Sequence, residues 1–208
     1  MQRIIPTIWT DDTAEDAVNF YEQVFGAVPT RTDYYTEAGR DQHGHNPGEV
    51  VTIEFEIEGF RMIALNGGSI FTPNPSVSFT LTRDSIESVD ALWQQLSGDG
   101  SKELMPLDAY PFSERYGWIQ DKFGVSWQIM LSGDGTQTPP TPSLLFVGDQ
   151  AGNAEAAMEF YASIFPDSTA PELSRYPAGS DPDKEGTVSY GEQLLFGQKL
   201  IAMDSAAD

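Results

Sequence analysis

The chain has 208 residues, no cysteine and a formal net charge of −21, from 32 acidic and 11 basic side chains. The absence of cysteine excludes disulfides, thiol catalysis and cysteine metal sites. The acidic balance argues against nucleic-acid binding, because that affinity comes largely from Lys and Arg neutralising phosphates. No stretch approaches the ~20 apolar residues of a membrane helix, and the N-terminus lacks a signal peptide's apolar run. We therefore expect a cytoplasmic protein with no membrane contact; self-repulsion for solubility, or adaptation to salt, would account for the charge.

The first third of the chain predicts a strand, a helix and three further strands. Residues 3–9 are apolar and β-rich, and the segment from Thr10 to Thr13 then offers helix-capping side chains. Apolar side chains at spacings of three and four predict a helix that ends at Gly26. These side chains are Ala14, Ala17, Val18, Tyr21, Val24 and Phe25. The three strand-like runs are residues 29–35, 50–57 and 61–66, and Glu58-Gly59 predicts a hairpin between the last two.

The same order of elements recurs in the middle of the chain. Residues 76–82 predict a strand, and residues 86–96 carry the apolar spacing of a helix. Two late strands are expected at 116–120 and 125–131, joined by a four-residue turn that ends in Gly124.

A third copy of the pattern follows a polar segment rich in Gly and Pro. Residues 143–147 predict a strand, the helical segment 156–165 mirrors 16–25, and 200–204 mirrors 62–66. We therefore expect one complete two-module domain over residues 1–132, a linker over 133–142, and a third module over 143–208 that forms half of a second domain.

A single module would leave a sheet edge and an apolar face uncovered, which favours association. The sequence thus predicts a homodimer in which the third modules of two copies complete one another. The alternative is that the missing half belongs after Asp208.

Three strings carry a resemblance to a known family. They are Ala17-Val18-Asn19-Phe20-Tyr21, the run from Phe60 to Gly68, and the run from Gly117 to Ile129. Paired βαβββ modules resemble the vicinal-oxygen-chelate superfamily of glyoxalases, bleomycin-resistance proteins and ring-cleaving dioxygenases, and these strings resemble its PhnB-like branch. That branch is often labelled 3-demethylubiquinone-9 3-methyltransferase. The resemblance implies an α+β fold with its site inside a cupped sheet, commonly around a divalent metal.

The residues at the implied ligand positions do not suit a metal. By resemblance these positions fall on Pro6, Ala64, Ser78 and Gln128. Divalent sites are built mostly from His nitrogens and carboxylate oxygens, so we expect no metal and no cofactor. The two His residues, His43 and His45, share one polar loop. We interpret that loop as solvated, the alternative being half of a metal site.

The methyltransferase label finds no support in the glycine-rich segments. A nucleotide or S-adenosylmethionine loop needs a strand, a glycine-rich turn and then a helix. Gly98-Asp99-Gly100 follows a helix, and Gly133-Asp134-Gly135 leads into the linker.

Candidate ligand-binding residues for the cup lie on the predicted strands. They are Trp9, Glu54, Asn66, Ser78 and Gln128. Polar groups in apolar strands need partners, and binding sites combine apolar walls with a few polar groups; the alternative is that these residues satisfy each other. If Gln128 faces the cup, Trp127 faces the helices. Two classes of function remain open: a metal-independent protein that binds a small, apolar or aromatic ligand, or an enzyme of the glyoxalase, dioxygenase or methyltransferase kind.

Overall fold

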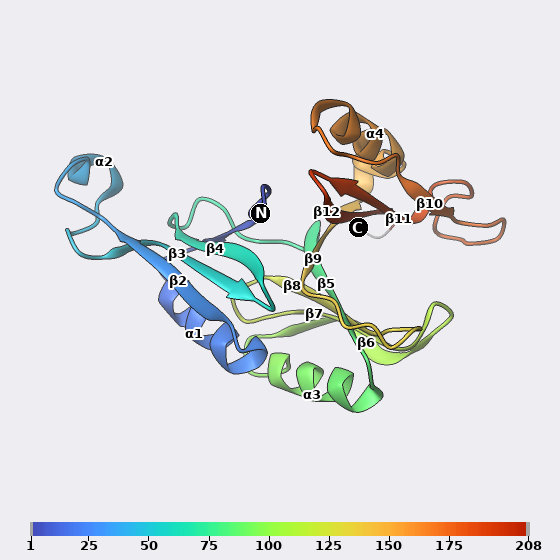
Figure 1. The fold of residues 1–208 in the computed structure, drawn as a ribbon, viewed down its shortest axis with the longest axis horizontal. Coiled ribbons are helices and arrows are strands. Elements are labelled where there is room, and N and C mark those ends of the chain that lie inside the picture. The colour runs from blue at the N-terminus through green and yellow to red at the C-terminus, as the bar shows by residue number, and fades with distance from the viewer. Residues whose placement is uncertain (1, 207–208) are drawn as a thin grey trace. The chain divides into compact units, whose positions relative to one another are not determined.

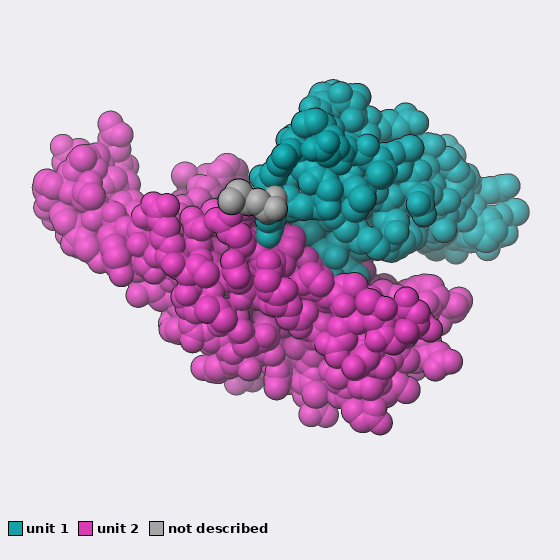
Figure 2. Space-filling model, in the orientation of Figure 1, with its two compact units in different colours: residues 1–4, 75–80, 141–208 teal, residues 5–74, 81–140 magenta. Residues whose placement is uncertain are grey.

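The computed structural model describes residues 2–206, and these form an α+β fold (Figure 1). The chain divides into two compact units, coloured separately in Figure 2. The large unit contains residues 5–74 and 81–140. The small unit contains residues up to 4, residues 75–80 and the chain from 141 onward. The three-part division predicted from the sequence (residues 1–132, 133–142 and 143–208) remains a proposal.

The first module forms a four-stranded sheet in the large unit. Its strands, in spatial order, are β1 (Thr7–Thr10), β4 (Phe60–Asn66), β3 (Val50–Ile57) and β2 (Val28–Tyr34). β1 runs parallel to β4, and the remaining neighbours are antiparallel. The predicted hairpin at Glu58-Gly59 is confirmed: both residues have positive φ, 52° and 80°, as a tight two-residue hairpin turn requires.

The second module supplies the remaining strands of the large unit. In spatial order they are residues 81–83 of β5 (Val77–Arg83), β8 (Ser126–Leu131), β7 (Ser113–Gln120) and β6 (Lys102–Tyr110). The sequence analysis missed β6. This strand ends the sheet order, contains Pro106 and is broken by register shifts, and edge strands tolerate proline and irregular pairing.

Helices α1 (Ala14–Phe25) and α3 (Ile86–Leu96) confirm the two helices predicted from apolar spacing, and both lie on the same side of the large unit's strands (Figure 1). The short α2 (Arg40–His43) lies in the loop after β2. α1 packs on both modules: the Tyr21 ring lies 5.8 Å from Phe55 of β3 and 5.5 Å from Trp127 of β8. All three side chains are fully buried. The core of the large unit therefore joins the two modules through α1.

The small unit repeats the module a third time. Its strands, in spatial order, are β10 (Glu172–Arg175), β11 (Val188–Leu195), β12 (Gln198–Asp204) and β9 (Thr141–Phe146). Helix α4 (Ala154–Ile164) follows a short 3₁₀ turn (Gly148–Gln150), and its buried Ala154 and Met158 pack on Val188 and Ala202. β9 begins inside the predicted linker, at Thr141, and β10 and β11 were not predicted.

The edge of the third module differs from the expectation. Residues 77–80 of β5 pair antiparallel with β9, with Ser78 opposite Ser143. The hydroxyls of Thr80 and Ser143 lie 2.7 Å apart. The sequence analysis expected the third module to leave a sheet edge uncovered; its β9 edge is covered by the same chain, whereas β10 ends the sheet order.

Candidate functional site

Strands β7 and β8 have one face that packs on the helices and one face that points away from them. Cross-strand partners share a face of a sheet, and Ile119 lies opposite Trp127 while Trp118 lies opposite Gln128. The Trp127 ring packs 4.5 Å from Phe25 of α1, so the expectation that Trp127 faces the helices is confirmed. We call the opposite side, formed by Tyr116, Trp118, Ser126 and Gln128, the cup face.

A buried hydrogen bond lies on the cup face. The Tyr116 hydroxyl donates to Oε1 of Gln128 over 2.8 Å, and both side chains are buried. Burial raises the pKa of Tyr116 well above its ordinary value, with a smaller contribution from Tyr110. Tyr116 therefore keeps its proton and acts as a donor at physiological pH.

Two polar atoms beside this pair have no partner within the described residues. They are Nε1 of Trp118 and Oγ of Ser126, both shielded from solvent. Trp118 lies opposite Gln128, and Ser126 lies two residues before it on β8. Buried polar groups in folded proteins are nearly always hydrogen-bonded, so two unpartnered donors on one face indicate a place where an acceptor is expected.

Trp9 and Glu54 share the open face of the first sheet. Ala64, which is fully buried, lies opposite Ile8 and Ile53 on the helix side, so the alternate positions Trp9 and Glu54 face away from α1. Both side chains already have hydrogen-bond partners. Nε1 of Trp9 donates to the Gly68 carbonyl over 2.7 Å, and Glu54 accepts from Arg61 over 2.8 Å.

Asn66 acts locally, at the end of β4. Its Oδ1 accepts from the backbone N–H of Ala14 over 2.9 Å and from the Thr10 hydroxyl over 2.8 Å, and its Nδ2 donates to the Val50 carbonyl over 3.0 Å. These bonds tie the first turn of α1 to the sheet. The side chain is buried, so a role of Asn66 in ligand binding stays a prediction.

Ser78 lies in the small unit, where it is buried opposite Ser143 on β9. Of the five predicted residues, the structure thus places Trp9 and Glu54 on one open face and Gln128 on the cup face. It does not bring all five together.

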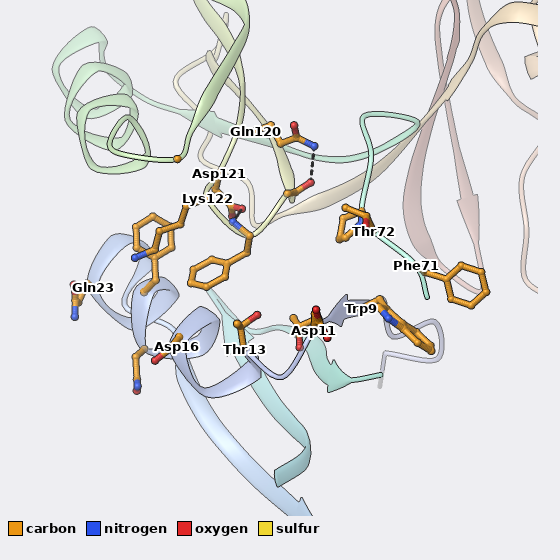
Figure 3. Close-up of a pocket in the computed structure, with 17 residues that line it drawn as sticks. Trp9, Asp11, Thr13, Asp16, Gln23, Phe71, Thr72, Gln120, Asp121 and Lys122 are labelled. Carbon is orange, nitrogen blue, oxygen red and sulfur yellow. Dashed lines mark hydrogen bonds between the residues drawn. The ribbon is translucent and has the colours of Figure 1, made fainter. Parts of the chain in front are cut away.

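An open groove of about 840 Å³ lies between α1 and the β7–β8 turn (Figure 3). The Lys122 ammonium lies over the rings of Phe20 and Phe123, at 4.9 and 5.2 Å from their centres. Asp11 and Asp16 line the same groove. The sequence analysis identified the turn but not the groove, because the contact between α1 and a turn about 100 residues later is purely tertiary.

Asp121 lines this groove and connects α1 to β8 through hydrogen bonds. Its Oδ2 accepts from the Tyr21 hydroxyl over 2.9 Å and from Nε1 of Trp127 over 2.8 Å. Its Oδ1 accepts from the backbone N–H groups of Phe123 and Val125. Burial raises the pKa of Asp121, and these four hydrogen bonds partly oppose that rise.

Comparison with known proteins then decides the family. The family model described as 3-demethylubiquinone-9 3-methyltransferase matches residues 2–130 and 139–208. The chain belongs to this family. A solved PhnB protein from Bacillus cereus, described as a 3-demethylubiquinone-9 3-methyltransferase, is 32% identical with a TM-score of 0.56, over 63% of this chain and 100% of its own.

A second solved structure shares the fold. It is a protein from Pseudomonas aeruginosa, 18% identical with a TM-score of 0.52, over 64% of this chain and 98% of its own. No curated protein matches the chain. The chain is therefore a PhnB-like member of the vicinal-oxygen-chelate superfamily, with the α+β fold that the sequence predicted. None of the helices within residues 2–206 has the length and apolar character needed to span a membrane.

The metal of other superfamily members does not fit the residues of this PhnB-like chain. The assignment of Ala64 to a cup position was wrong, because Ala64 faces α1; the open face carries Ile63 and Leu65 instead. Neither offers a ligand atom. Within the described part of the chain, no three His, Asp or Glu side chains converge as a metal site would require.

The two His residues are held in a ring stack. The rings of His43 and His45 lie 4.5 and 4.1 Å from that of Tyr35, and Nδ1 of His45 lies 3.2 Å from Glu49. The Tyr35 hydroxyl in turn donates to the Asn66 carbonyl over 2.8 Å. The loop between β2 and β3 is thus attached to the end of β4.

Proposed function

We propose that this PhnB-like protein binds a small organic molecule on the cup face of β7 and β8, without a metal ion. The observation that carries the proposal is a pair of buried polar atoms on that face, Nε1 of Trp118 and Oγ of Ser126, which have no hydrogen-bond partner among residues 2–206. A buried donor without an acceptor costs about 1–3 kcal/mol. A ligand that supplied the acceptor would recover this free energy on binding.

The chemistry of the cup face narrows the class of ligand. An indole N–H is a donor only, and a serine hydroxyl donates or accepts, so the ligand needs at least one acceptor atom, such as a carbonyl or hydroxyl oxygen. The remaining surface of Trp118 is apolar, which suits a flat, aromatic or unsaturated body. Phenols, quinones and similar cyclic ketones combine these two features.

The matched variants Trp118→Phe and Trp9→Phe test this proposal. A panel of simple phenols and quinones, with hydrocarbons of the same ring size as references, is titrated against the protein by calorimetry. We expect an oxygenated compound to bind and Trp118→Phe to weaken that binding about tenfold, the equivalent of one hydrogen bond of about 1.4 kcal/mol. Trp9→Phe should keep the affinity, because the indole N–H of Trp9 already donates to the Gly68 carbonyl.

Two results would overturn the proposal. One is the absence of binding by every oxygenated compound. The other is an equal loss of affinity in both tryptophan variants, which would place the ligand elsewhere. An enzyme of the glyoxalase, dioxygenase or methyltransferase kind is the alternative, and binding that requires a divalent metal or S-adenosylmethionine would favour it.

We further propose that the protein is a cytoplasmic homodimer. The support for the dimer is the apolar surface of the third module: Phe160 and Ile164 are more than half exposed. The cytoplasmic location rests on the cysteine-free composition, which suits a reducing compartment.

A further inference from the structure

The groove between α1 and the β7–β8 turn has an aromatic end away from Lys122 (Figure 3). There the ring of Trp9 meets that of Phe71 edge to face, with ring centres 5.0 Å apart, and Phe71 is 62% exposed. The indole of Trp9 is fixed by its surroundings. Its Nε1 donates to the Gly68 carbonyl, and the backbone at Gly67 lies so close that a Cβ there would clash with the ring. This end of the groove is therefore a preformed apolar surface.

Two exposed carboxylates line the same groove. Asp11 follows β1, and Asp16 lies in the first turn of α1. Negative side chains are favoured at a helix N-terminus, which accounts for the position of Asp16. Within the described part of the chain, neither carboxylate has an ion pair or a side-chain hydrogen bond. The groove thus carries two negative charges that the fold does not neutralise.

Lys122 shows how an ammonium group is held in this groove. Its Nζ lies 4.9 Å from the ring centre of Phe20 and 5.2 Å from that of Phe123. A cation over the face of an aromatic ring is attracted by the ring's quadrupole, so this end already holds an ammonium that the chain itself supplies. The other end offers the same two kinds of surface, because Asp11 lies two residues after Trp9.

The charge and size of the groove decide which ligands suit it. An anion would meet two carboxylates in a chain with a net charge of −21, and a neutral ring would leave both carboxylates without a counter-charge. Asp121 does not change this balance, since its oxygens accept hydrogen bonds within the fold. The volume of about 840 Å³ lies in the range of small-molecule sites, roughly 300–1,000 Å³. An organic cation with a flat ring meets all of these requirements.

We propose that this groove binds aromatic amines. The ring of the amine lies against Trp9 and Phe71, and its ammonium lies beside Asp11 and Asp16. The site is separate from the cup face, because Trp118, which carries the cup-face proposal, is not among the residues that line the groove. The inference therefore goes beyond the proposed function and does not depend on it.

The test is a titration of the isotope-labelled full-length protein with tryptamine, followed by NMR on the indole N–H signals. Tryptophol and indoleacetate carry the same ring with a neutral and an anionic side chain. The salt concentration is kept at about 0.15 M, where long-range attraction of cations to the acidic surface is screened. The Trp9 and Trp118 signals are assigned with the variants Trp9→Phe and Trp118→Phe.

We expect tryptamine to shift the Trp9 signal and to leave the Trp118 signal in place. Tryptophol should bind about fivefold more weakly, because exposed ion pairs are each worth a few-fold in affinity. Indoleacetate should not bind, because its carboxylate meets Asp11 and Asp16.

Matched charge variants test the role of the two carboxylates. Asp11→Asn combined with Asp16→Asn should weaken tryptamine binding about fivefold. The control is Glu87→Gln combined with Glu114→Gln, which removes the same charge from exposed positions of the second module. Glu87 lies in the first turn of α3 as Asp16 lies in that of α1, so any effect on helix stability is matched. The control should keep the affinity.

Four results would overturn the proposal. The first is the absence of tryptamine binding, and the second is equal binding of tryptophol and tryptamine. The third is an equal loss of affinity in both double variants, which would indicate a general attraction of cations to an acidic protein. The fourth is a shift of the Trp118 signal without a shift of the Trp9 signal, which would place tryptamine on the cup face.

Discussion

Asp121 shows how one buried carboxylate holds two modules together. It accepts hydrogen bonds from Tyr21 of α1 and from Trp127 of β8, and it also closes its own turn through two backbone N–H groups. The side chain is 2% exposed. Its hydrogen-bonding capacity is fully used by acceptor contacts, which an amide cannot reproduce because half of its polar atoms are donors.

We predict that Asp121→Asn lowers the free energy of unfolding by about 1–3 kcal/mol, since at least one buried donor loses its acceptor. Denaturant unfolding measures the change, and Glu114→Gln, at an exposed position of β7, is a control that alters charge without touching these bonds. An unchanged denaturant concentration at the unfolding midpoint would contradict the role of Asp121 in connecting α1 to β8.

The pH dependence of this effect has a definite sign. Burial raises the pKa of Asp121 in the folded protein, so the folded state binds this proton more tightly than the unfolded chain. The contribution of Asp121 to stability therefore grows as the pH falls from its folded-state pKa towards about 3.9, the ordinary value for Asp. In Asp121→Asn this slope should be absent; an identical pH profile in both proteins would contradict the raised pKa.

At the scale of secondary structure, the last residue of the fourth strand caps the helix in the first and third modules. Asn66 accepts from the N–H of Ala14, the first residue of α1. Asp204 accepts from the N–H of Ala154, the first residue of α4, and also from Gly152 and Val188. The repeat thus uses an amide in one module and a carboxylate in another for the same task, because both offer an acceptor to a helix N-terminus.

We predict that Asn66→Ala lowers the free energy of unfolding by about 1–3 kcal/mol, because the buried N–H of Ala14 and carbonyl of Val50 both lose their partner. Asn66→Asp should lose less, since it keeps the acceptor used by Ala14. Thermal unfolding compares them with the exposed control Ser69→Ala. Equal stability of Asn66→Ala and wild type would contradict this structural role of Asn66.

The elements that could be predicted from the sequence are those with a strong local pattern. The helices follow from apolar side chains at spacings of three and four, and the β3–β4 hairpin follows from Glu58-Gly59. Strand β6 could not be found, because an edge strand with Pro106 and register shifts has no clean alternation. Asn66 was assigned to the cup because its actual partner could not be predicted. That partner, Ala14, lies 52 residues away, and no local sequence pattern indicates the contact.

The candidate site was predictable only in part. The family resemblance implied that Gln128 lies in the cup, and the alternation of β8 then required its neighbour Trp127 to face the helices. Trp118 and Ser126 were missed as site residues, because an unpartnered buried atom is visible only when every neighbouring group is in place. The groove beside Lys122 depends on the packing of α1 on the second module and was missed for the same reason.

For the molecule as a whole, the repeat of one module is the dominant fact. Two copies form the core of the large unit through α1, and the third copy has its own core in the small unit. The family match extends over all three copies, whereas the solved PhnB protein is covered completely by 63% of this chain. More than a third of this chain thus lies outside the match to that solved relative.

The claim that ligand binding needs no metal is tested most directly by elemental analysis of the purified, undialysed protein, combined with its melting temperature with and without chelator. We predict less than stoichiometric metal and an unchanged melting temperature, because the described residues offer no converging set of metal ligands. One bound metal per chain together with a lower melting temperature after chelation would contradict the account and would point to the loop that holds His43 and His45.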